Sequence, residues 1–544
     1  MPSEPQSHTP VRSLRETLNR CRFAQGPDLD ALDTSALSDI QWRADRCTPH
    51  SLLCFQRLDD GRTDAALIER YLQHSDFGAL VIDRPLEGSH DQAASLAGRP
   101  VFVTAPNAWG ETLERLCDHF YPLGPAHWRI AGVTGTNGKT TTVQYLEAIL
   151  RAAGRRVLGL GTLGLTLNGA PLAETGFTSP PYIELRRILN DCRAQADTLV
   201  MEVSSHALHQ GRVHGLRFAA AAWTNFSQDH LDYHGDEARY FAAKALILDQ
   251  LADGVPLFTT SAEVARRLRA SPERGADVPV VPIEVPALPA ECASKPPLAQ
   301  PDRRTSAPAT LPADALRAHP FLALGYNRAN YALACALATR LLGAEPEEPW
   351  RALQPVPGRF DCHVYRNWTI VIDFAHTPDA LANILGAIRE AFPNAGVLTL
   401  FGCGGDRDRA KRPLMGAAVC RGSDRVILTS DNPRFEDPRA IADDTLAGMT
   451  DCDPPPTLIL DRAEAIAALF DHLAAQPEDE PWVALIAGKG HESSIDRHGI
   501  KRPYSDREQV LLNLRKIRSV RSFYRSNERP NDPIPIDMID SSPS

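Results

Sequence analysis

The 544-residue sequence lacks the patterns of a membrane-bound, secreted or nucleic-acid-binding chain. It has no apolar run that approaches the roughly 20 residues of a membrane-spanning helix. Its polar first residues, MPSEPQSHTPVRSL, lack the apolar core of a secretory signal. The formal net charge of -10 predicts no broad basic surface for nucleic acid. We therefore expect a cytoplasmic protein without a membrane span or a nucleic-acid partner.

Cysteine is present, but not with the spacing of a metal site or a disulfide framework. The eleven cysteines, from Cys21 to Cys452, are odd in number and include no C-x-x-C pair. Scattered cysteines of this kind predict neither a zinc ribbon nor a disulfide scaffold. We expect buried, reduced thiols.

The remaining composition is that of a globular protein, with 43% hydrophobic and 23% charged residues. A chain of this length predicts roughly two to four domains. From about residue 128 onward, apolar runs alternate with helical patterns, which predicts parallel strands covered by helices. The expected strands are SLLCF, GALVIDR, WRIAGVT, TLVMEV, FAAAAWT, WTIVIDF, GVLTLF, RVILTS and WVALIAG.

Composition shifts predict a smaller N-terminal domain (1–125), a central domain (126–350), a C-terminal domain (351–519) and a disordered tail (520–544). The boundary near residue 350 follows from LQPVPGRFDC, where two prolines separate a helical stretch from a new strand. Eleven prolines in residues 271–320 predict an irregular segment inside the central domain.

The stretch GVTGTNGKTTT, residues 132–142, lies between an apolar run and a helical pattern, as a phosphate-binding loop does. Gly135 and Gly138 would let main-chain N–H groups approach the phosphates of a nucleotide, and Lys139 would reach the β- and γ-phosphates. Thr140 would offer a hydroxyl to Mg²⁺.

Two glycine-rich details need interpretation. Val133 stands where the strict loop motif has its first glycine, so only the entry to the loop differs. The stretch GLGTLG at residues 159–164 is followed by no helical pattern and therefore does not predict a dinucleotide site.

Polar side chains follow two predicted strands, where a parallel sheet forms its ligand crevice. Glu202 follows TLVM, His230 and His234 follow AAAWT, and Lys244 lies in the next helical run. The H-x-x-x-H spacing of the histidines suggests zinc on its own, but it lacks the glutamate of H-E-x-x-H and is expected in a loop. A carboxylate facing a polyphosphate requires a cation between them, so the sequence favours Mg²⁺.

Nine stretches, in order from about residue 130 to 510, resemble the Mur ligase family and within it the MurE type. They are GVTGTNGKTTT, MEVSSHALHQGRV, TNFSQDHLDYHGD, FAAKALIL, GRFD, VIDFAHTPDAL, FGCGGDRDRAKRPLMG, SDNPRFEDP and AGKGHESS. The resemblance implies an α/β fold of three domains. These are a central P-loop-type ATPase domain with a parallel sheet, a C-terminal Rossmann-like domain for the amino acid, and a smaller N-terminal α/β domain for the UDP end of the substrate.

The resemblance also implies an ADP-forming acid–amino-acid ligase of peptidoglycan biosynthesis, and so of cell wall biogenesis, cell shape and cell division. ATP phosphorylates the carboxylate of a UDP-linked muramoyl dipeptide, and the amino group of a free amino acid attacks the acyl phosphate. The DNPR variant of one motif is associated with meso-diaminopimelate. ATP and Mg²⁺ are the implied cofactors and the partners are small molecules; we expect a monomer.

The resemblance implies a role for each matched residue. The catalytic set is Lys139, Glu202, His230 and Lys244. The Mg²⁺ ligands are Thr140, Glu202, His230 and, if carbamylated, Lys244. The ATP contacts are Gly135, Thr136, Asn137, Gly138, Lys139, Thr140, Thr141, Asn327, Asn330 and, across the domain seam, Arg359 and Asp373. The acceptor contacts are Asp45, Arg46, Thr178, Ser179, Ser204 and Arg212. The amino-acid contacts are Arg407, Asp431, Asn432, Pro433, Arg434, Gly488 and Glu492.

The N-terminal domain departs from the family pattern. Where relatives show D-S-R, the sequence reads ADRCTPHSLLCF, so that Asp45 replaces a serine expected near the UDP group, and only DDGR persists nearby. One alternative is therefore a paralogue that joins an amino acid to a different carboxylate. Another is a non-catalytic scaffold, against which the presence of Lys139, Glu202 and Lys244 speaks.

Overall fold

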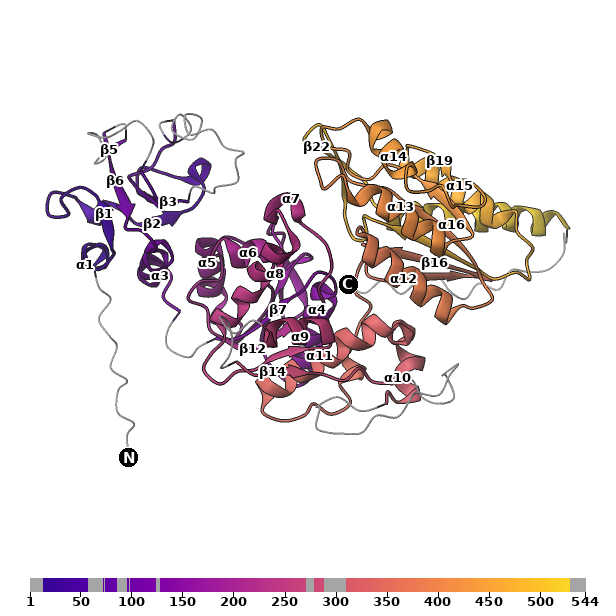
Figure 1. Cartoon of the computed structure of the whole chain (residues 1–544), viewed down its shortest axis with the longest axis horizontal. Helices are drawn as coiled ribbons and strands as arrows, with labels where there is room; N and C mark the ends of the chain where they lie inside the picture. The colour runs from indigo at the N-terminus through magenta and orange to yellow at the C-terminus, as the bar shows by residue number, and fades with distance from the viewer. Residues whose placement is uncertain are drawn as a thin grey trace. The chain divides into compact units, whose positions relative to one another are not determined.

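The computed structural model of the chain describes residues 13–56, 72, 74–85, 95–96, 98–123, 128–270, 278–287 and 310–528. The chain divides into two compact units, Met1–Gln354 and Pro355–Ser544. In the described ranges three larger sheets, each with helices packed on it, form an α/β fold (Figure 1). No helix in these ranges is both long enough and apolar enough to cross a membrane.

The first sheet belongs to the N-terminal part of the first unit. Its described elements are α1 Leu14–Asn19, β1 Phe23–Gln25, η1 Thr34–Ala36, β2 Asp39–Gln41, η2 Ala44–Arg46, β3 Ser51–Phe55, β4 Ala79–Ile82, β5 Ser95–Leu96, β6 Arg99–Thr104 and α3 Trp109–Phe120. The strand order is β1–β6–β4–β3–β2, with β5 paired to β6. The sheet packs against α1 and α3 through buried residues such as Leu52, Val81 and Phe102.

The second sheet carries the glycine-rich loop at the end of a central strand. Its described strands are β7 Arg129–Thr134, β8 Val157–Gly161, β9 Gly164–Leu167, β10 Ala170–Ala173, β11 Thr198–Glu202, β12 Phe218–Trp223, β13 Leu257–Thr259 and β14 Val280–Pro282. Their order is β10–β9–β8–β11–β7–β12–β13–β14. In this order, the neighbouring strands from β8 through β11, β7, β12 and β13 to β14 are all parallel. Parallel strands are covered on both faces, which explains their continuous apolar runs.

Helices cover both faces of this second sheet. The described helices are α4 Lys139–Ala152, α5 Tyr182–Cys192, α6 Ser205–His209, α7 Leu231–His234, α8 Glu237–Ala245, η3 Leu246–Gln250, α9 Ala262–Arg269, α10 Ala313–Ala318, η5 Pro320–Ala323, α11 Gly325–Leu342 and η6 Pro349–Ala352. One core joins Ile130, Leu199 and Met201 to α5, α6 and α9. Because side chains alternate along a strand, the residues between them face the other side, where α4 and α11 pack.

The second unit has a single large sheet in its described residues. Its elements are β15 Asp361–Tyr365, β16 Trp368–Asp373, α12 Pro378–Ala391, β17 Gly396–Phe401, α13 Lys411–Gly422, β18 Arg425–Leu428, α14 Pro438–Leu446, β19 Thr457–Leu458, α15 Arg462–Ala474, β20 Trp482–Ala487, the hairpin β21 Ser494–Arg497 and β22 Ile500–Pro503, and α16 Asp506–Glu528. The order is β15–β16–β20–β17–β18–β19. Within this six-stranded sheet, β15 pairs with β16 in the antiparallel direction and all other described pairs are parallel.

The nine strands expected from apolar runs are all confirmed. The GLGTLG stretch forms the end of β8 and the turn into β9, which confirms that no helix follows it. His230 and His234 do not lie in a loop as expected, since Leu231–His234 forms the short helix α7 with His230 at its N-cap.

Three other expectations need correction. The proline-rich segment is not irregular throughout its described part, because it contains β14 and α10. Since β14 is an edge strand, a proline that lacks an N–H group costs no hydrogen bond on its outer side; residues 271–277 and 288–309 lie outside the described ranges. Residues 520–528 of the expected disordered tail are helical, because α16 continues to Glu528 with no proline or glycine to end it, and residues 529–544 lie outside the described ranges.

The expectation of reduced thiols is wrong for one pair of cysteines. Cys420, near the end of α13, and Cys452, after α14, form a disulfide with a Cα–Cα distance of 4.8 Å. The packing of α13 on α14 brings these two positions together over a separation of 32 residues. Eight other cysteines in the described residues are free.

Candidate active site

The phosphate loop joins β7 to α4. Val133 is buried in β7 and pairs with Glu202 on β11, so the position of the missing glycine belongs to the strand. α4 begins at Lys139, after Gly138 in a left-handed conformation with φ of +84°. Lys139 Nζ donates to the main-chain oxygens of Gly135 and Thr136, both at 2.8 Å. The lysine therefore folds over the loop.

Close packing beneath the loop requires both glycines. A Cβ on Gly138 would collide with Asn330 Oδ1, and a Cβ on Gly135 would collide with Thr224 Oγ1. Thr224 also donates to the carbonyl of Asn137 at 2.5 Å. The main chain is supported from below and carries no side chain at these two positions, which fits the close approach of nucleotide phosphates.

The end of β12 ties down the remaining loop residues. Asn137 N donates to Asn225 Oδ1 at 2.9 Å, and Asn225 Nδ2 donates back to Asn137 O at 3.1 Å. Thr136 Oγ1 donates to Ser227 O at 3.1 Å. These contacts rigidify the loop before any ligand arrives.

Asn327 and Asn330, both expected to contact ATP, have different partners in the structure. Asn330 lies under the phosphate loop, where Thr142 Oγ1 donates to its Oδ1 at 3.3 Å. Asn327 Nδ2 instead donates to Phe321 O at 3.1 Å. Both side chains are buried, and Asn330 supports the loop from α11.

Lys244 reaches the same loop from α8. Its Nζ donates to Gly135 O at 2.8 Å and lies 4.7 Å from the ring centroid of Tyr240. Burial lowers the pKa of Lys244 well below its usual value, and the charge of Lys139 lowers it further, against the attraction of Asp229. A neutral amine is therefore favoured in the protein without ligands.

His230 is held beside Asp229 near the two lysines. Its Nε2 lies 3.4 Å from Asp229 Oδ2, and its ring meets that of His206 edge-on at 4.9 Å between centroids. Burial lowers the pKa of His230 to about 3; Asp229 opposes this shift, and His206, Lys244 and Lys139 add to it. The imidazole is therefore neutral near pH 7, the form that can bind a metal. His234 Nε2 lies instead 3.0 Å from Ser205 Oγ.

Glu202 ends β11 and is almost completely buried. Its two carboxylate oxygens accept hydrogen bonds from Thr162 N at 2.7 Å and Thr162 Oγ1 at 3.2 Å. Sequence reasoning missed Thr162, which lies in the GLGTLG turn that was set aside as a dinucleotide motif. The turn serves instead to orient the carboxylate.

Two of the residues expected to hold Mg²⁺, Thr140 and Glu202, offer the oxygen atoms that a hard cation prefers. Thr140 and Thr141 are buried in the first turn of α4, Glu202 supplies a carboxylate, and His230 supplies a neutral nitrogen. No group of three His, Cys, Asp or Glu side chains suited to a metal occurs in the described ranges. The expected set does not require one, because only Glu202 and His230 belong to those types.

The expected acceptor residues form one connected cluster with Glu202. Ser179 Oγ donates to the main-chain oxygen of Glu202 at 2.8 Å and accepts from Ser204 N at 3.1 Å. Arg212 Nη1 donates to Ser179 O at 2.9 Å, and Thr178 Oγ1 lies 3.2 Å from Thr162 Oγ1. The hydroxyl of Ser179 is therefore engaged in shaping the cluster.

Gln210 is a residue of this cluster that sequence reasoning missed. Its Oε1 accepts from Arg212 Nε at 2.8 Å and Nη2 at 2.5 Å, and its Nε2 donates to Tyr233 OH at 3.0 Å. It lies two residues before Arg212 in HALHQGRV, so position in a quoted motif was the available signal. Burial lowers the pKa of Arg212.

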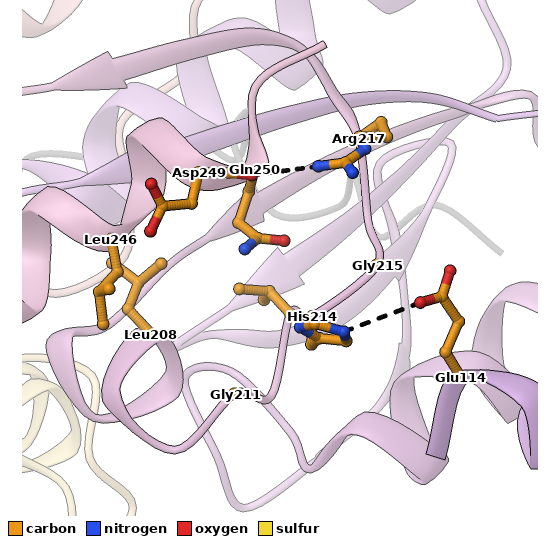
Figure 2. A pocket seen from close by; sticks show the side chains of 10 residues that line it. Glu114, Leu208, Gly211, His214, Gly215, Arg217, Leu246, Asp249 and Gln250 are labelled. Carbon is orange, nitrogen blue, oxygen red and sulfur yellow. Dashed lines mark hydrogen bonds and ion pairs between the residues drawn. The ribbon is translucent and has the colours of Figure 1, made fainter. Parts of the chain in front are cut away.

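A cavity of about 370 Å³ is lined in part by the loop that includes Gly211, His214 and Gly215 (Figure 2). The rim pairs His214 Nε2 with Glu114 Oε2 of α3 at 3.8 Å, and Arg217 Nη1 donates to Asp249 O at 3.1 Å. These two contacts fasten the loop to α3 and η3. Arg212, which donates to Ser179 O, thus lies shortly before two anchored residues of the same loop.

The N-terminal acceptor residues lie on η2. Asp45 accepts two hydrogen bonds from Arg43, Nε to Oδ1 at 2.9 Å and Nη2 to Oδ2 at 2.6 Å. Hydrogen bonding by the Arg43 side chain lowers the pKa of Asp45. Arg46 is exposed. Trp42 meets Phe177 edge-on at 5.7 Å, so η2 adjoins the acceptor loop. The DDGR stretch lies outside the described residues.

In the second unit, Asp373 and Arg359 gather at the carboxyl end of β16. Asp373 accepts from Phe360 N at 2.8 Å and from Ala375 N at 2.7 Å. Burial raises the pKa of Asp373, and Arg359 opposes that rise. The Arg359 guanidinium lies 4.3 Å from the ring centroid of Phe374.

The expected amino-acid residues converge where β17, β18 and β20 end. Arg434 Nη1 donates to Gly405 O at 2.6 Å. Burial lowers the pKa of Arg434, and the neighbouring charge of Arg407 adds to this. Arg407 is exposed and forms no hydrogen bond or ion pair with another residue in the described part of the chain. Two guanidinium groups that repel each other in this way suit a carboxylate ligand, which would carry the opposite charge.

The other members of this set are held by contacts with one another and with their neighbours. Asn432 Nδ2 donates to Glu492 Oε2 at 2.8 Å. A Cβ on Gly488 would come within 2.6 Å of Asp431 Oδ2, and Pro433 O accepts from Glu436 N at 3.0 Å. Asp431, Asn432 and Pro433 follow β18, and Gly488 and Glu492 follow β20.

Lys489 is the residue of this region that sequence reasoning missed. It is completely buried between Asn432, Glu492 and Asp431. The available signal was its place directly after the apolar run of β20, between two glycines of AGKGHESS.

Comparisons with known proteins show which family and which enzymes this chain is similar to. Two family models match, the Mur ligase middle domain over residues 133–287 and the Mur ligase, glutamate ligase domain over residues 358–490. A UDP-N-acetylmuramoyl-L-alanyl-D-glutamate--2,6-diaminopimelate ligase of Solibacter usitatus (strain Ellin6076) is 40% identical over 387 residues, covering 67% of this chain and 72% of the relative. An enzyme of the same name from Geobacillus thermodenitrificans (strain NG80-2) is 37% identical over 422 residues, covering 74% and 82%. A solved structure of an enzyme of that name is similar at 25% identity with a TM-score of 0.53, covering 89% of this chain and 95% of that one.

Proposed function

The chain belongs to the Mur ligase family, and from that premise we propose that it adds meso-diaminopimelate to UDP-N-acetylmuramoyl-L-Ala-D-Glu in an ATP-dependent reaction. It would act as a monomer in the cytoplasm, in peptidoglycan precursor synthesis. The observation that carries the proposal is the two-sided amino-acid site. Arg407 and Arg434 stand together for a carboxylate, and Glu492 offers a carboxylate for an ammonium group.

The reaction has two chemical steps. A carboxylate is a poor electrophile because its oxygen does not leave as an oxide. Transfer of the γ-phosphoryl group of ATP to that oxygen gives an acyl phosphate and ADP. The neutral amine of the amino acid then attacks the carbonyl carbon, phosphate leaves with the bonding electron pair, and the nitrogen loses a proton to give the amide.

Both partners in the first step are anions, so the site has to neutralise charge. We assign this role first to Lys139, whose ammonium now donates to two main-chain carbonyls. Phosphate oxygens are stronger acceptors for this ammonium than the carbonyls are, because they carry a full negative charge. The ammonium group can therefore move from the two carbonyls to a phosphate while Lys139 stays at the start of α4.

Thr140, Glu202, His230 and a carbamylated Lys244 are the residues that we propose to hold Mg²⁺. Bound Mg²⁺ would neutralise part of the phosphate charge. The low pKa of Lys244 supports carbamylation, because only the neutral amine attacks CO₂, giving a carbamate and a proton. The charge at this position then changes from one that repels a cation to one that attracts it.

The acceptor side supports a UDP-linked substrate over a different carboxylate. Asp45 replaces an expected serine, but its charge is matched by Arg43 through two hydrogen bonds. The negative charge that argued against a nearby pyrophosphate is thereby balanced.

Phosphate release measured over a panel of carboxylate acceptors crossed with amino acids tests the proposal. We expect turnover with UDP-N-acetylmuramoyl-L-Ala-D-Glu and meso-diaminopimelate, little with L-lysine, and none in Lys139→Ala. The exposed Arg151 on the same helix provides a control, and Arg151→Ala should behave as the wild type. Turnover with another acceptor but not the UDP-linked dipeptide would establish the paralogue.

A further inference from the structure

We propose that Lys489 is a positioning residue for the incoming amino acid. It commits one oxygen of Glu492 and keeps that carboxylate ionised, so that the other oxygen remains for the ammonium group of the ligand. The inference deepens the proposed function and rests on it.

Lys489 is a buried cation with a defined set of acceptors. It is the second residue after β20, and none of its side chain is exposed. Its Nζ donates to Glu492 Oε2 at 2.8 Å and to Asn432 Oδ1 at 3.0 Å, and Asp431 Oδ1 lies 3.9 Å away. A buried ammonium group is tolerated only with partners of this kind, so the position of Lys489 is fixed by them.

Asn432 transmits this arrangement to the second donor. Its Oδ1 accepts from Lys489 Nζ and from Asp496 N, the latter at 2.9 Å. Both partners can only donate, so the orientation of the amide is determined and its Nδ2 must point the other way. That Nδ2 donates to Glu492 Oε2 at 2.8 Å.

The two oxygens of Glu492 are therefore unequal. Oε2 accepts from both Lys489 and Asn432, whereas Oε1 accepts from no residue in the described ranges. The side chain is 33% exposed, so a ligand can reach it. Oε1 is the oxygen that the network leaves for an ammonium group.

The charges around Glu492 explain why this cation matters. Burial raises the pKa of Glu492, but the charge and hydrogen bond of Lys489, the bond from Asn432 and the charge of His491 together lower it. The other charged groups that face it are Arg434 and, through Lys489, Asp431. Without Lys489, burial has much less opposition, and Glu492 takes up a proton at a higher pH.

Steady-state kinetics of Lys489→Met between pH 5.5 and 8.5 test this role. We expect the KM for meso-diaminopimelate to rise about tenfold or more near pH 6 and by progressively less as the pH increases. The kcat should change less than about threefold, because the chemistry takes place elsewhere. Glu492→Gln should instead show a raised KM at every pH, since its amide does not titrate.

Arg389→Met is the control, because Arg389 is a half-buried cation of this unit that pairs with Asp424, at the amino end of β18 and so at the opposite edge of the sheet from the site. Its loss should lower stability without changing the pH dependence of the KM. A Lys489→Met enzyme with the wild-type KM throughout the pH range would refute the role of Lys489 alone. A wild-type enzyme that does not consume meso-diaminopimelate would refute the proposed function and this role with it.

A crystal structure of the wild-type enzyme with meso-diaminopimelate decides the matter if Lys489→Met fails to fold. We expect a ligand ammonium within hydrogen-bond distance of Glu492 Oε1, with Lys489 still on Oε2. A ligand that displaces Lys489, or an ammonium group bound away from Glu492, would overturn the proposal.

Discussion

Lys139 and Lys244 donate to the same acceptor, the main-chain oxygen of Gly135, each across 2.8 Å. Two ammonium groups cannot share one carbonyl without repulsion, and the charge of Lys139 is one cause of the low pKa of Lys244. In the absence of ligands the site is thus poised with one charged and one neutral amine. Phosphate for the first and CO₂ for the second would relieve the conflict.

Lys244→Met should separate stability from activity. The variant removes a buried amine that is costly to charge, and Gly135 O keeps its bond from Lys139. We expect the melting temperature of the ligand-free protein to rise by about 2 °C, roughly 1 kcal/mol for a large domain, while turnover falls at least about 100-fold. Scanning calorimetry and phosphate release measure the two effects. A less stable variant would show that Lys244 is charged and paired in the native state.

Thr162→Val should reduce turnover by about tenfold, because it removes one of two hydrogen bonds that orient Glu202, worth ~1.4 kcal/mol. Thr166→Val is a close control. Thr166 lies in the same hairpin and donates to a different buried carboxylate, that of Glu147, at 2.8 Å. It should lose stability but keep the wild-type kcat. Equal kinetic losses in the two variants would mean that the hairpin matters only for folding.

Arg434→Ala should raise the KM for meso-diaminopimelate by about 100-fold and leave the KM for ATP unchanged. The variant removes a charge-assisted interaction worth ~2–3 kcal/mol with the carboxylate. Arg439→Ala, at an exposed position of α14, is the control for loss of a nearby positive charge. Steady-state kinetics with each substrate varied in turn check the prediction, and an unchanged KM in Arg434→Ala would remove the amino-acid assignment.

His230 should make the ligand-free protein less stable in mild acid. Its pKa is about 3 when folded, below the ordinary histidine pKa of about 6.5, so the unfolded chain takes up the proton first as the pH falls. This contribution is constant above about pH 6.5 and is lost progressively as the pH falls toward 3. The side chain is 40% exposed, so we expect a loss of only about 1 kcal/mol between pH 6.5 and 4.5. Urea unfolding of the wild type and His230→Gln at several pH values measures it; equal slopes in the two would contradict the prediction.

Part of the fold and of the site was readable from local patterns. Strands such as β7 and β11 are buried on both faces, and only continuous apolar runs satisfy that requirement. A phosphate loop is built from adjacent residues, so the stretch from Gly135 to Thr140 could be recognised from the sequence together with the strand before it and the helix after it. Glu202 could be placed because the end of a parallel strand is a defined position in the crevice.

What remained hidden depends on which distant segments become neighbours. Thr162 reaches Glu202 over 40 residues because β8 lies beside β11, and Lys489 reaches Asn432 over 57 residues because their loops follow strands of one sheet. The Arg43–Asp45 pair needed side-chain geometry, and the Cys420–Cys452 bond needed the packing of α13 on α14. Apolar periodicity specifies that a strand is buried, but not beside which strand it lies. Tertiary packing alone therefore chose the partners that orient these polar groups.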